Sequence, residues 1–376
     1  MKKFSLISFG RKLNRNLAAL VVSTAVLGTT FPAPAAEAFG VWDAVNIGIG
    51  AASMHAQKEA ALKQYRRLNE TEDGRQEWYQ RMRSECGVSE DVELNQRAES
   101  IMSNLSAAVA KVDPSINEMQ YLYFVNPSQE INAFCTFGRV MSLNAGILQK
   151  IPNDDEIAVV VGHEMGHGQK NHTYRGVVAQ YDKTLFANIA VAAEGGSFLG
   201  QLVGNLALVQ SVTHGNKGYE KEADELSFEY ISNSGYNIGA TAAVWQRVLE
   251  LTGDNSQNVF GSVFMPSDHP NHAARRDTYV KKLYEYSKKH ATAKDGTVTV
   301  NDKVFVTPAA AAGMSAPERS YFVLGNLARA FHNGEDKKGV TVVNGTVKLG
   351  NQSIMTPVDG DESAETLATR LESLLK

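Results

Sequence analysis

Hydrophobic residues recur every three to four positions over much of the chain, which is the spacing of amphipathic helices. This pattern predicts helices over residues 41–84, 90–111, 153–170, 220–232, 241–251 and 272–289. Alternating apolar and polar residues instead predict strands over residues 119–125, 131–137 and 140–143. Ser89 is the expected N-cap of the second helix, and Pro152-Asn153-Asp154-Asp155 is a start signal for the third, with its acids well placed for the helix dipole.

Residues 184–212 are strongly apolar and need a separate interpretation. The stretch contains Glu194 and is broken by Gly195-Gly196, and a glutamate in the middle of a helix is costly in lipid. We therefore expect a buried helical hairpin that packs on the rest of the protein. A membrane span is the alternative.

The C-terminal part of the chain contains an internal repeat with an offset of 49 residues. Residues 295–308 (DGTVTVNDKVFVTP) align with residues 344–357 (NGTVKLGNQSIMTP), and a helical pattern follows each hairpin, over residues 316–331 and 363–375. We expect two strand–strand–helix units around one small core, after a polar linker at residues 290–296. The module could bind an envelope protein partner or serve as a structural cap.

These elements predict an α+β protein in three parts: residues 1–38, residues 39–290 with an N-terminal helical segment at 41–87, and residues 291–376. The first part has a basic stretch, a short apolar run and small residues near Ala36 and Ala38, as in secretory signal peptides. Cleavage near Ala36 or Ala38 would give an exported chain, periplasmic or extracellular. An uncleaved membrane anchor is the alternative, although the apolar run is shorter than a bilayer span.

Charge and cysteine content narrow the function classes further. The formal net charge is −4, and loss of the signal peptide would make the chain more acidic. An acidic chain without a basic run is a poor candidate for binding nucleic acid or anionic membranes. Cys86 and Cys135 are the two cysteines, and in an oxidising compartment they are candidates for one disulfide.

One predicted helix carries metal chemistry in the motif His163-Glu164-Met165-Gly166-His167. Residues four apart lie on one helix face, so both imidazoles can reach one zinc ion. Glu164 can act as base toward a water at that ion. Gly162 and Gly166 keep the helix surface slim, so that a strand or a substrate backbone can approach.

A catalytic zinc usually takes three protein ligands, so a third must come from elsewhere in the chain. Glu220 and Asp224 share a face of a later helix, where one could bind the metal and the other could hold a ligand imidazole by its second nitrogen. Glu222 should point away from Glu220. The alternative is an ordinary solvated charged helix face.

These residues, in this order, resemble the HtpX and CAAX prenyl protease superfamily of zinc metallopeptidases, and its soluble, exported bacterial members most of all. Three further segments carry the resemblance: Asn132-Ala133-Phe134 with Gly138, then Gly146-Ile147-Leu148, and His269-Pro270 with Arg275. Order and spacing agree over residues 88–285, and residues 41–87 fit less well. The repeated tail lies outside the resemblance.

The resemblance implies a mainly helical, zincin-like metalloprotease domain with one zinc per chain. It implies His163, His167 and Glu220 as ligands, Glu164 as general base and Asp224 as partner of a ligand histidine. This chain has Phe137 and Arg139 where the family often has Pro and Gly. That departure concerns the shape of the strand edge that faces the substrate, and hence substrate preference.

The expected mechanism also needs a partner for the oxyanion, and His269 and Arg275 are the candidates. His269 could instead fill the open zinc position, and a structural His-Pro and an Arg paired with an acid are the alternatives. The strand at Val140, Met141, Ser142 and Leu143, with Asn132 nearby, could bind substrate by β-augmentation if it lies at a sheet edge. His172, whose partly charged imidazole a helix C-terminus would stabilise, is given no ligand role, and His55, His214, His290 and His332 are interpreted as surface residues.

The sequence therefore predicts a zinc-dependent endopeptidase that cuts unfolded or misassembled polypeptides in the cell envelope, as part of protein quality control. The alternative is an envelope chaperone or binding protein with a latent protease site and a working C-terminal module. A third interpretation, a membrane-embedded protease, requires residues 184–212 to span the bilayer.

Overall fold

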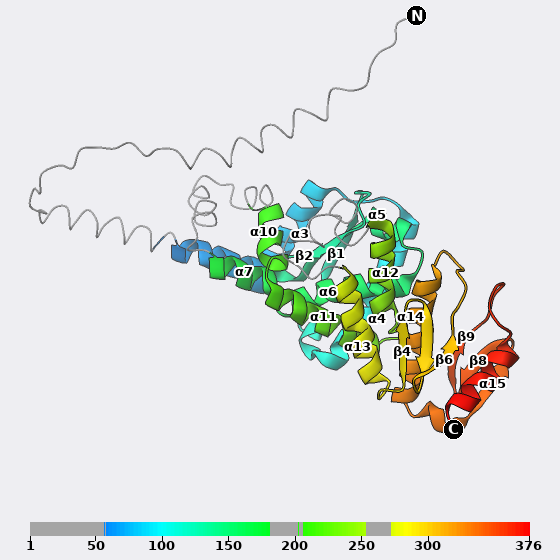
Figure 1. Cartoon of the computed structure of the whole chain (residues 1–376). Helices are drawn as coiled ribbons and strands as arrows, with labels where there is room; N and C mark the ends of the chain where they lie inside the picture. Colours follow the sequence, from blue (N-terminus) through cyan, green and yellow to red (C-terminus); the bar gives the residue numbers. More distant parts are fainter. Residues whose placement is uncertain (1–55, 57, 181–201, 203–205, 253–271) are drawn as a thin grey trace, which may run out of the picture. The chain divides into compact units, whose positions relative to one another are not determined.

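The computed structural model describes residues 56, 58–180, 202, 206–252 and 272–376 (Figure 1). The expected signal peptide at residues 1–38, most of the apolar stretch at 184–212 and His269 lie outside this part of the chain. Within it, no helix combines the length and the apolar character needed to cross a bilayer.

Within the predicted N-terminal helical segment the structure has a helix at residues 58–70 and α3 (Glu72–Cys86), and α4 (Val92–Val112) follows it. Thr71 caps α3 by accepting a hydrogen bond from the N–H of Gly74. The cap of α4 is Asp91, whose carboxylate accepts from the N–H groups of Glu93 and Leu94, so the predicted cap at Ser89 is wrong. Asp91 is favoured because a carboxylate also interacts well with the positive end of the helix.

A three-stranded sheet follows, made of β1 (Leu122–Asn126), β2 (Ala133–Cys135) and β3 (Val140–Asn144). The strand order is β1-β3-β2, with β3 parallel to β1 and antiparallel to β2. The prediction that β3 is an edge strand is therefore wrong, because strands pair with it on both sides. Val140, Met141, Ser142 and Leu143 are buried within the sheet, and Asn132 is buried beside it.

Two helices form the centre of the protein, α6 (Asp154–Gln169), which begins at the Asn153 cap, and α11 (Lys217–Ser232). They cross through small residues: a Cβ on Gly166 would lie 3.0 Å from the Cα of Ala223, and one on Gly162 would lie 3.3 Å from Ser227 Oγ. The glycines of α6 thus allow close packing of helix α11, where the sequence analysis expected a strand or a substrate backbone. The remaining helices around this pair are α5 (Ala145–Lys150), α7 (His172–Gln180), α10 (Leu206–His214), α12 (Ala240–Thr252) and α13 (His272–Tyr286).

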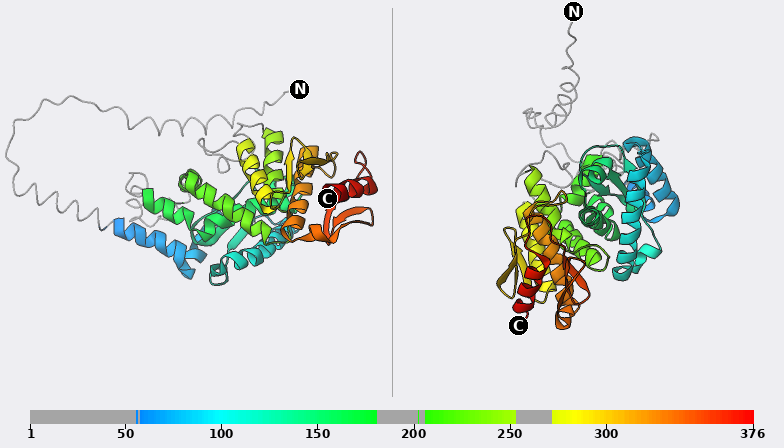
Figure 2. Two further views of the ribbon diagram at one scale, coloured as in Figure 1. Left: turned by 60° about the horizontal axis from the view of Figure 1, so that its bottom comes forward. Right: turned by 90° about the vertical axis from the view of Figure 1, so that its right-hand side faces the viewer.

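Each C-terminal repeat has three strands before its helix, where two were predicted. The first unit is β4 (Ala291–Lys294), β5 (Thr297–Val300), β6 (Lys303–Val306) and α14 (Ala316–His332). The second is β7 (Val340–Val343), β8 (Thr346–Leu349), β9 (Gln352–Met355) and α15 (Ala364–Leu374). Both sheets are antiparallel meanders, and Figure 2 shows the second unit in orange to red next to the first.

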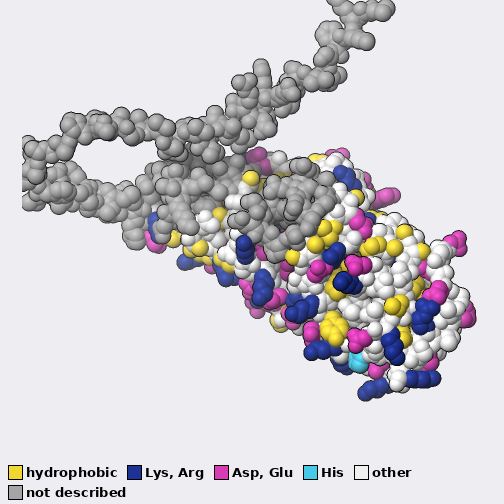
Figure 3. All heavy atoms as spheres, viewed as in Figure 1, with side chains coloured by type: hydrophobic (Ala, Val, Ile, Leu, Met, Phe, Trp, Pro, Cys, Tyr) yellow, Lys and Arg dark blue, Asp and Glu magenta, His cyan; other side chains and the backbone are white. Residues whose placement is uncertain are grey.

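The segment predicted as a linker at residues 290–296 contains β4, so that prediction is wrong. Ala291 and Ala293 are buried and alternate with more exposed residues. Because alanine is only weakly hydrophobic and the residues between the alanines are polar, the sequence pattern did not predict this strand. The surface shown in Figure 3 has acidic and basic side chains interspersed.

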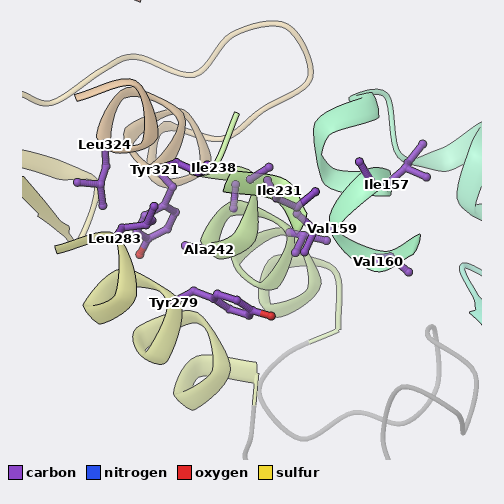
Figure 4. Packing of buried hydrophobic residues seen from close by; sticks show 14 of the residues in the cluster. Ile157, Val159, Val160, Ile231, Ile238, Ala242, Tyr279, Leu283, Tyr321 and Leu324 are labelled. Carbon is purple, nitrogen blue, oxygen red and sulfur yellow. The ribbon is translucent and has the colours of Figure 1, made fainter. Parts of the chain in front are cut away.

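The repeats share a hydrophobic core with the preceding helices. Figure 4 shows core residues from both parts side by side, with Tyr279 and Leu283 of α13 near Tyr321 and Leu324 of α14. The backbones also approach closely, because a Cβ on Gly325 would lie 2.2 Å from the backbone N of Gly239. The division at residue 290 stays a prediction from sequence, and packing is continuous across it.

A buried cluster of charges joins α6, α12 and α14. The guanidinium of Arg247 donates to both carboxylate oxygens of Glu156, at 3.0–3.2 Å, and lies 3.3 Å from Glu318 Oε1. Glu318 also forms a capping box with Ser315 at the start of α14. One cation thus serves two buried carboxylates, and burial raises the pKa of Glu318 to about 7.

We predict that this cluster makes stability depend on pH. A carboxyl whose pKa is about 7 when folded and 4.5 when unfolded stabilises the fold fully at low pH, and this contribution is lost as the pH rises through 7. Glu318→Gln keeps the acceptor for the capping bond. Relative to the parent, it should therefore raise the free energy of unfolding by roughly 2–3 kcal/mol more at pH 8 than at pH 5. Urea unfolding at the two pH values measures this difference.

The control is Glu365→Gln, an exposed glutamate in the first turn of α15. It should leave the difference between pH 5 and pH 8 unchanged. If Glu318→Gln and Glu365→Gln give the same pH dependence as the parent, Glu318 does not titrate in this range.

Candidate metal centre

Three predicted ligands converge on one point between α6 and α11. The Nε2 atoms of His163 and His167 lie 3.1 Å apart. Glu220 places Oε2 at 3.3 Å from the first and Oε1 at 3.1 Å from the second. All three side chains are buried.

This arrangement fits a zinc ion. Two ligands at about 2.0–2.1 Å from a tetrahedral ion lie about 3.3 Å from each other, close to the separations found here. Two imidazoles and one carboxylate are also a donor set that zinc accepts in catalytic sites. With His214 these residues form a buried group whose ligand atoms all lie within 4.8 Å of one another. The group could hold a metal ion.

Asp224 contacts the nitrogen of His163 that faces away from the metal group. This agrees with the prediction that one of the two carboxylates, Glu220 or Asp224, holds an imidazole by its second nitrogen. Its Oδ1 lies 2.9 Å from His163 Nδ1, and the hydroxyl of Tyr279 donates to the same oxygen at 3.1 Å. Burial alone would raise the pKa of Asp224, but the Arg275 guanidinium and His163 hold it at about 2. The carboxylate therefore stays charged and holds the ring of His163, a predicted ligand.

Arg275 reaches the site through Asp224. Its guanidinium bonds both oxygens of that carboxylate and lies 3.8 Å from the centre of the Trp245 ring. The side chain is buried between these partners. Arg275 thus matches the alternative interpretation given above, a structural arginine paired with an acid. This geometry makes Arg275 a positioning residue. His269, the other candidate for the oxyanion, lies outside the described residues.

His172 contacts His167, the second predicted ligand. Its Nδ1 lies 2.9 Å from His167 Nδ1, its Nε2 lies 3.0 Å from Glu222, and its ring stacks on Tyr219. Glu222 thus contacts His172, and its orientation away from Glu220 stays a prediction. The prediction of a partly charged His172 is wrong, because burial lowers its pKa to about 4. It stands at the beginning of α7, where a positive charge is disfavoured.

His214 is a site residue that the sequence did not reveal. It was interpreted as a surface residue, but its side chain is 2% exposed. Nδ1 lies 2.9 Å from Glu220 Oε1, and Nε2 lies 3.9 Å from Glu164 Oε2. Its position six residues before Glu220 is the one signal that could have pointed to it. Of the others, His290 and His332 stack on Phe331 and Tyr286, and His55 is outside the described residues.

Glu164 faces the metal group from α6 and is fixed by the sheet. The N–H of Cys135, in β2, donates to Glu164 Oε2 at 3.0 Å. Burial raises the pKa of this carboxyl above its ordinary value, against the lowering effect of His214 and His163. Cys135 and Cys86 are both free thiols, so the expected disulfide is not formed. Cys135 serves the site through its backbone.

The two departures from the family pattern lie in the turn after β2. Phe137 stacks on Tyr65, with ring centres 5.7 Å apart, and meets the edge of Trp78 at 5.9 Å. Arg139 has a left-handed backbone, with φ of 58°, and donates to the carbonyls of Ser115 and Met119. The departures therefore anchor the turn to the N-terminal helices and to the residues before β1.

A pocket of about 310 Å³ adjoins the metal group between α11 and α13. Glu220, Asp224 and Arg275 line it on the side of the metal group. Glu225, Thr278 and three lysines complete the described lining; the lysines are Lys217, Lys221 and Lys282.

Comparison with known proteins agrees with this geometry. The model of Peptidase family M48 matches residues 94–281, half of the chain. Metalloprotease LoiP of Escherichia coli is 25% identical over 163 residues, covering 43% of this chain and 62% of the relative. Metalloprotease YcaL is 27% identical over 161 residues, covering 42% and 62%.

The beta-barrel assembly-enhancing protease of Escherichia coli is 23% identical over 252 residues, which is 64% of this chain and 47% of that protein. The chain thus spans between about half and three fifths of the length of these relatives. The resemblance seen in the motifs is confirmed, and with it the assignment to zinc metallopeptidases. The chain belongs to peptidase family M48.

Proposed function

We propose that this protein is a zinc-dependent endopeptidase of the cell envelope that cuts unfolded or misassembled polypeptides, with Glu164 as general base. The observation that carries the proposal is the convergence of His163, His167 and Glu220 beside the Glu164 carboxylate. The sequence motif supplies two ligands and the base, and the fold adds a carboxylate from another helix at the separation that zinc requires.

Zinc in this site would polarise the scissile carbonyl and lower the pKa of a water molecule. Glu164 takes a proton from the water and delivers it to the leaving amine. The Cys135 N–H holds one oxygen of Glu164, so the carboxylate keeps a fixed direction during this transfer. His163 and His167 are held by Asp224 and His172, which keeps their metal-facing nitrogens in place.

Strand β2 is our candidate for binding the substrate backbone, in place of β3. Residues 132 and 136 bond to β3, and Cys135 turns its N–H to Glu164. Groups alternate in direction along a strand, so the N–H and C=O of Ala133 face away from β3 as those of Cys135 do. An extended peptide beside Ala133 would run next to Glu164.

The envelope location and the substrate class rest on two observations. The first 38 residues have the pattern of a signal peptide, and a related protein of Escherichia coli is named for enhancing β-barrel assembly. An edge strand that pairs with backbone accepts many sequences, which suits a protease for unfolded chains.

Partner binding by the repeats is a second candidate role. Val304, Val343 and Val358 are exposed on or next to the strands of the repeats, at 40–57% of their surface. In this interpretation the repeats recruit a partner and the peptidase site is secondary. Val304→Ser with Val343→Ser would then reduce cleavage of a recruited protein while casein cleavage stays at the parent rate.

The first test of the proposed base is Glu164→Gln. The amide keeps the size of the side chain but cannot accept a proton from water. We expect casein cleavage to fall by at least 100-fold, a typical effect of losing a general base, with one zinc per chain retained. Cleavage rate and zinc content of the same preparation are the measurements.

Glu229→Gln is the matched control, because Glu229 is exposed on α11 and lies outside the site. It should cleave casein at the parent rate. Parent-like cleavage by Glu164→Gln would show that another residue is the base, and a parent protein without zinc would remove the proposed function altogether.

Asp224→Asn tests the support of the ligand histidine. The change removes the charge that Arg275 and His163 share, while the size of the side chain is kept. We expect zinc affinity, measured by competition with a chelator, to fall by about 10–100-fold. Glu229→Gln, which changes an exposed glutamate of α11 outside the site, is the control. Equal zinc affinity for parent and Asp224→Asn would exclude this supporting role.

A further inference from the structure

The pocket between α11 and α13 has no task in the proposed mechanism, although it adjoins the metal group. Two rows of side chains form its walls: residues 217, 220, 221, 224 and 225 of α11, and residues 275, 278 and 282 of α13. Residues three, four and seven apart share one helix face, so the rows follow the facing sides of the two helices. Because Glu220, a predicted ligand, stands in the first row, a polypeptide bound at the metal group has this pocket beside it.

The charges at the metal end of the pocket compensate one another. The Arg275 guanidinium forms an ion pair with the Asp224 carboxylate. Glu220 has three histidines as partners, at 2.9–3.3 Å. This end therefore offers little net charge to a bound substrate.

The outer part of the pocket is positive. Lys217 and Lys282 line it, and neither has an acidic ion-pair partner in the part of the chain that the structure describes. The Nζ atom of Lys282 lies 5.6 Å from the centre of the Phe228 ring, a cation–π contact that holds the ammonium group in place. Lys221 and Glu225 form only a loose pair, with 3.9 Å between the charged atoms and 80% and 54% of the side chains exposed.

The helix dipole adds to this positive potential. Lys217 is the first residue of α11, directly after the Asn216 cap. Carboxylates are favoured at this end of a helix and ammonium groups are disfavoured, so an anion beside Lys217 would improve the local electrostatics. The whole chain has a net charge of −4, so the positive pocket is a local feature and does not follow from the overall composition.

We propose that this pocket binds a carboxylate of the polypeptide substrate, held by Lys217 and Lys282, and so influences where the chain is cut. The inference rests on the proposed peptidase function and names the chemistry of its preferred substrate. A volume of about 310 Å³ is small for a ligand site and suits one side chain or one chain end. The stems of the lysines can pack on the methylene groups of a glutamate while their ammonium groups meet its carboxylate.

The test compares blocked peptides that differ in one residue. Each peptide carries an acetyl group and an amide at its ends, and has Glu, Gln or Lys at one of the positions next to the cut bond. The zinc-loaded full chain should cut the best glutamate peptide roughly tenfold more efficiently than its glutamine counterpart, the scale of two partly exposed ion pairs. High salt should reduce this ratio, because salt screens such pairs. The measurements are kcat/KM and the position of the cut by mass spectrometry.

A second arm distinguishes the two sources of a carboxylate. The glutamine peptide with a free C-terminus presents an α-carboxylate in place of a side-chain carboxylate. Preference for this peptide would support a pocket that recognises chain ends, and preference for the blocked glutamate peptide would support one that recognises side chains. Binding of the same peptides to Glu164→Gln, measured by fluorescence anisotropy, should follow the same order without cleavage.

Lys217→Glu with Lys282→Glu reverses the charge of the pocket. This variant should prefer the lysine peptide to the glutamate peptide, and Lys217→Gln with Lys282→Gln should show little preference between them. The control is Lys303→Glu with Lys337→Glu, which changes two exposed lysines of the repeats and alters the net charge by the same amount. It should keep the preference of the parent.

Two results would overturn the inference while the proposed function stands. One is a parent protein that cuts the glutamate and glutamine peptides, blocked or free, with equal efficiency at every position. The other is a charge-reversed variant that has the zinc content and circular dichroism of the parent and still prefers glutamate. A parent protein that cuts neither the peptides nor casein would refute the proposed function, and the inference with it.

Discussion

The close approach of α6 and α11 is the constraint on which the metal centre depends. In this protein the packing of α11 on α6 brings the Glu220 carboxylate to 3.1–3.3 Å from the two imidazoles. Gly162 and Gly166 on α6 meet Ser227 and Ala223 on α11, and the Ser227 hydroxyl donates to a carbonyl of α6 at 2.8 Å. A larger side chain at any of these positions would move the carboxylates of α11 away from the imidazoles of α6. The small residues of the motif therefore matter as much as its histidines.

The close packing of α6 and α11 also buries several charged side chains. Hydrogen-bond and ion-pair partners offset the free-energy cost of burying them. Removing one partner of a buried ion pair typically costs 3–5 kcal/mol, because the other charge remains without compensation. Asp224 has Arg275, His163 and Tyr279 as partners, and Glu220 has three histidines. Burial would raise the pKa of Glu220, but His163 and the hydrogen bonds from these histidines hold it well below its ordinary value. Each carboxylate is thus kept ionised and oriented before any ligand binds.

The sequence predicted those parts of the site that lie along one helix. The periodicity of α6 and α11 places His163 with His167 and Glu220 with Asp224, because residues four apart share a face. It could not predict the order of the strands, which depends on pairing between distant segments, so β3 was mistaken for an edge strand. His214 was missed for the same reason, since its place depends on how α10 turns into α11. Strand β4 was missed because its buried residues are alanines, which give a weak hydrophobic signal.

The N-terminal helices contribute to the chemistry although they carry no site residue. Trp78 donates to Thr136 Oγ1 at 2.7 Å, Arg75 donates to the Gly138 carbonyl at 2.7 Å, and Phe137 packs on both Tyr65 and Trp78. These contacts fix the turn that directly follows Cys135, whose N–H orients Glu164. Gly138 has a φ of +63°, and a Cβ there would lie 2.6 Å from the Leu68 carbonyl, so the turn fits these helices only with glycine. An N-terminal segment that fits the family less well therefore helps to fix the turn next to the base.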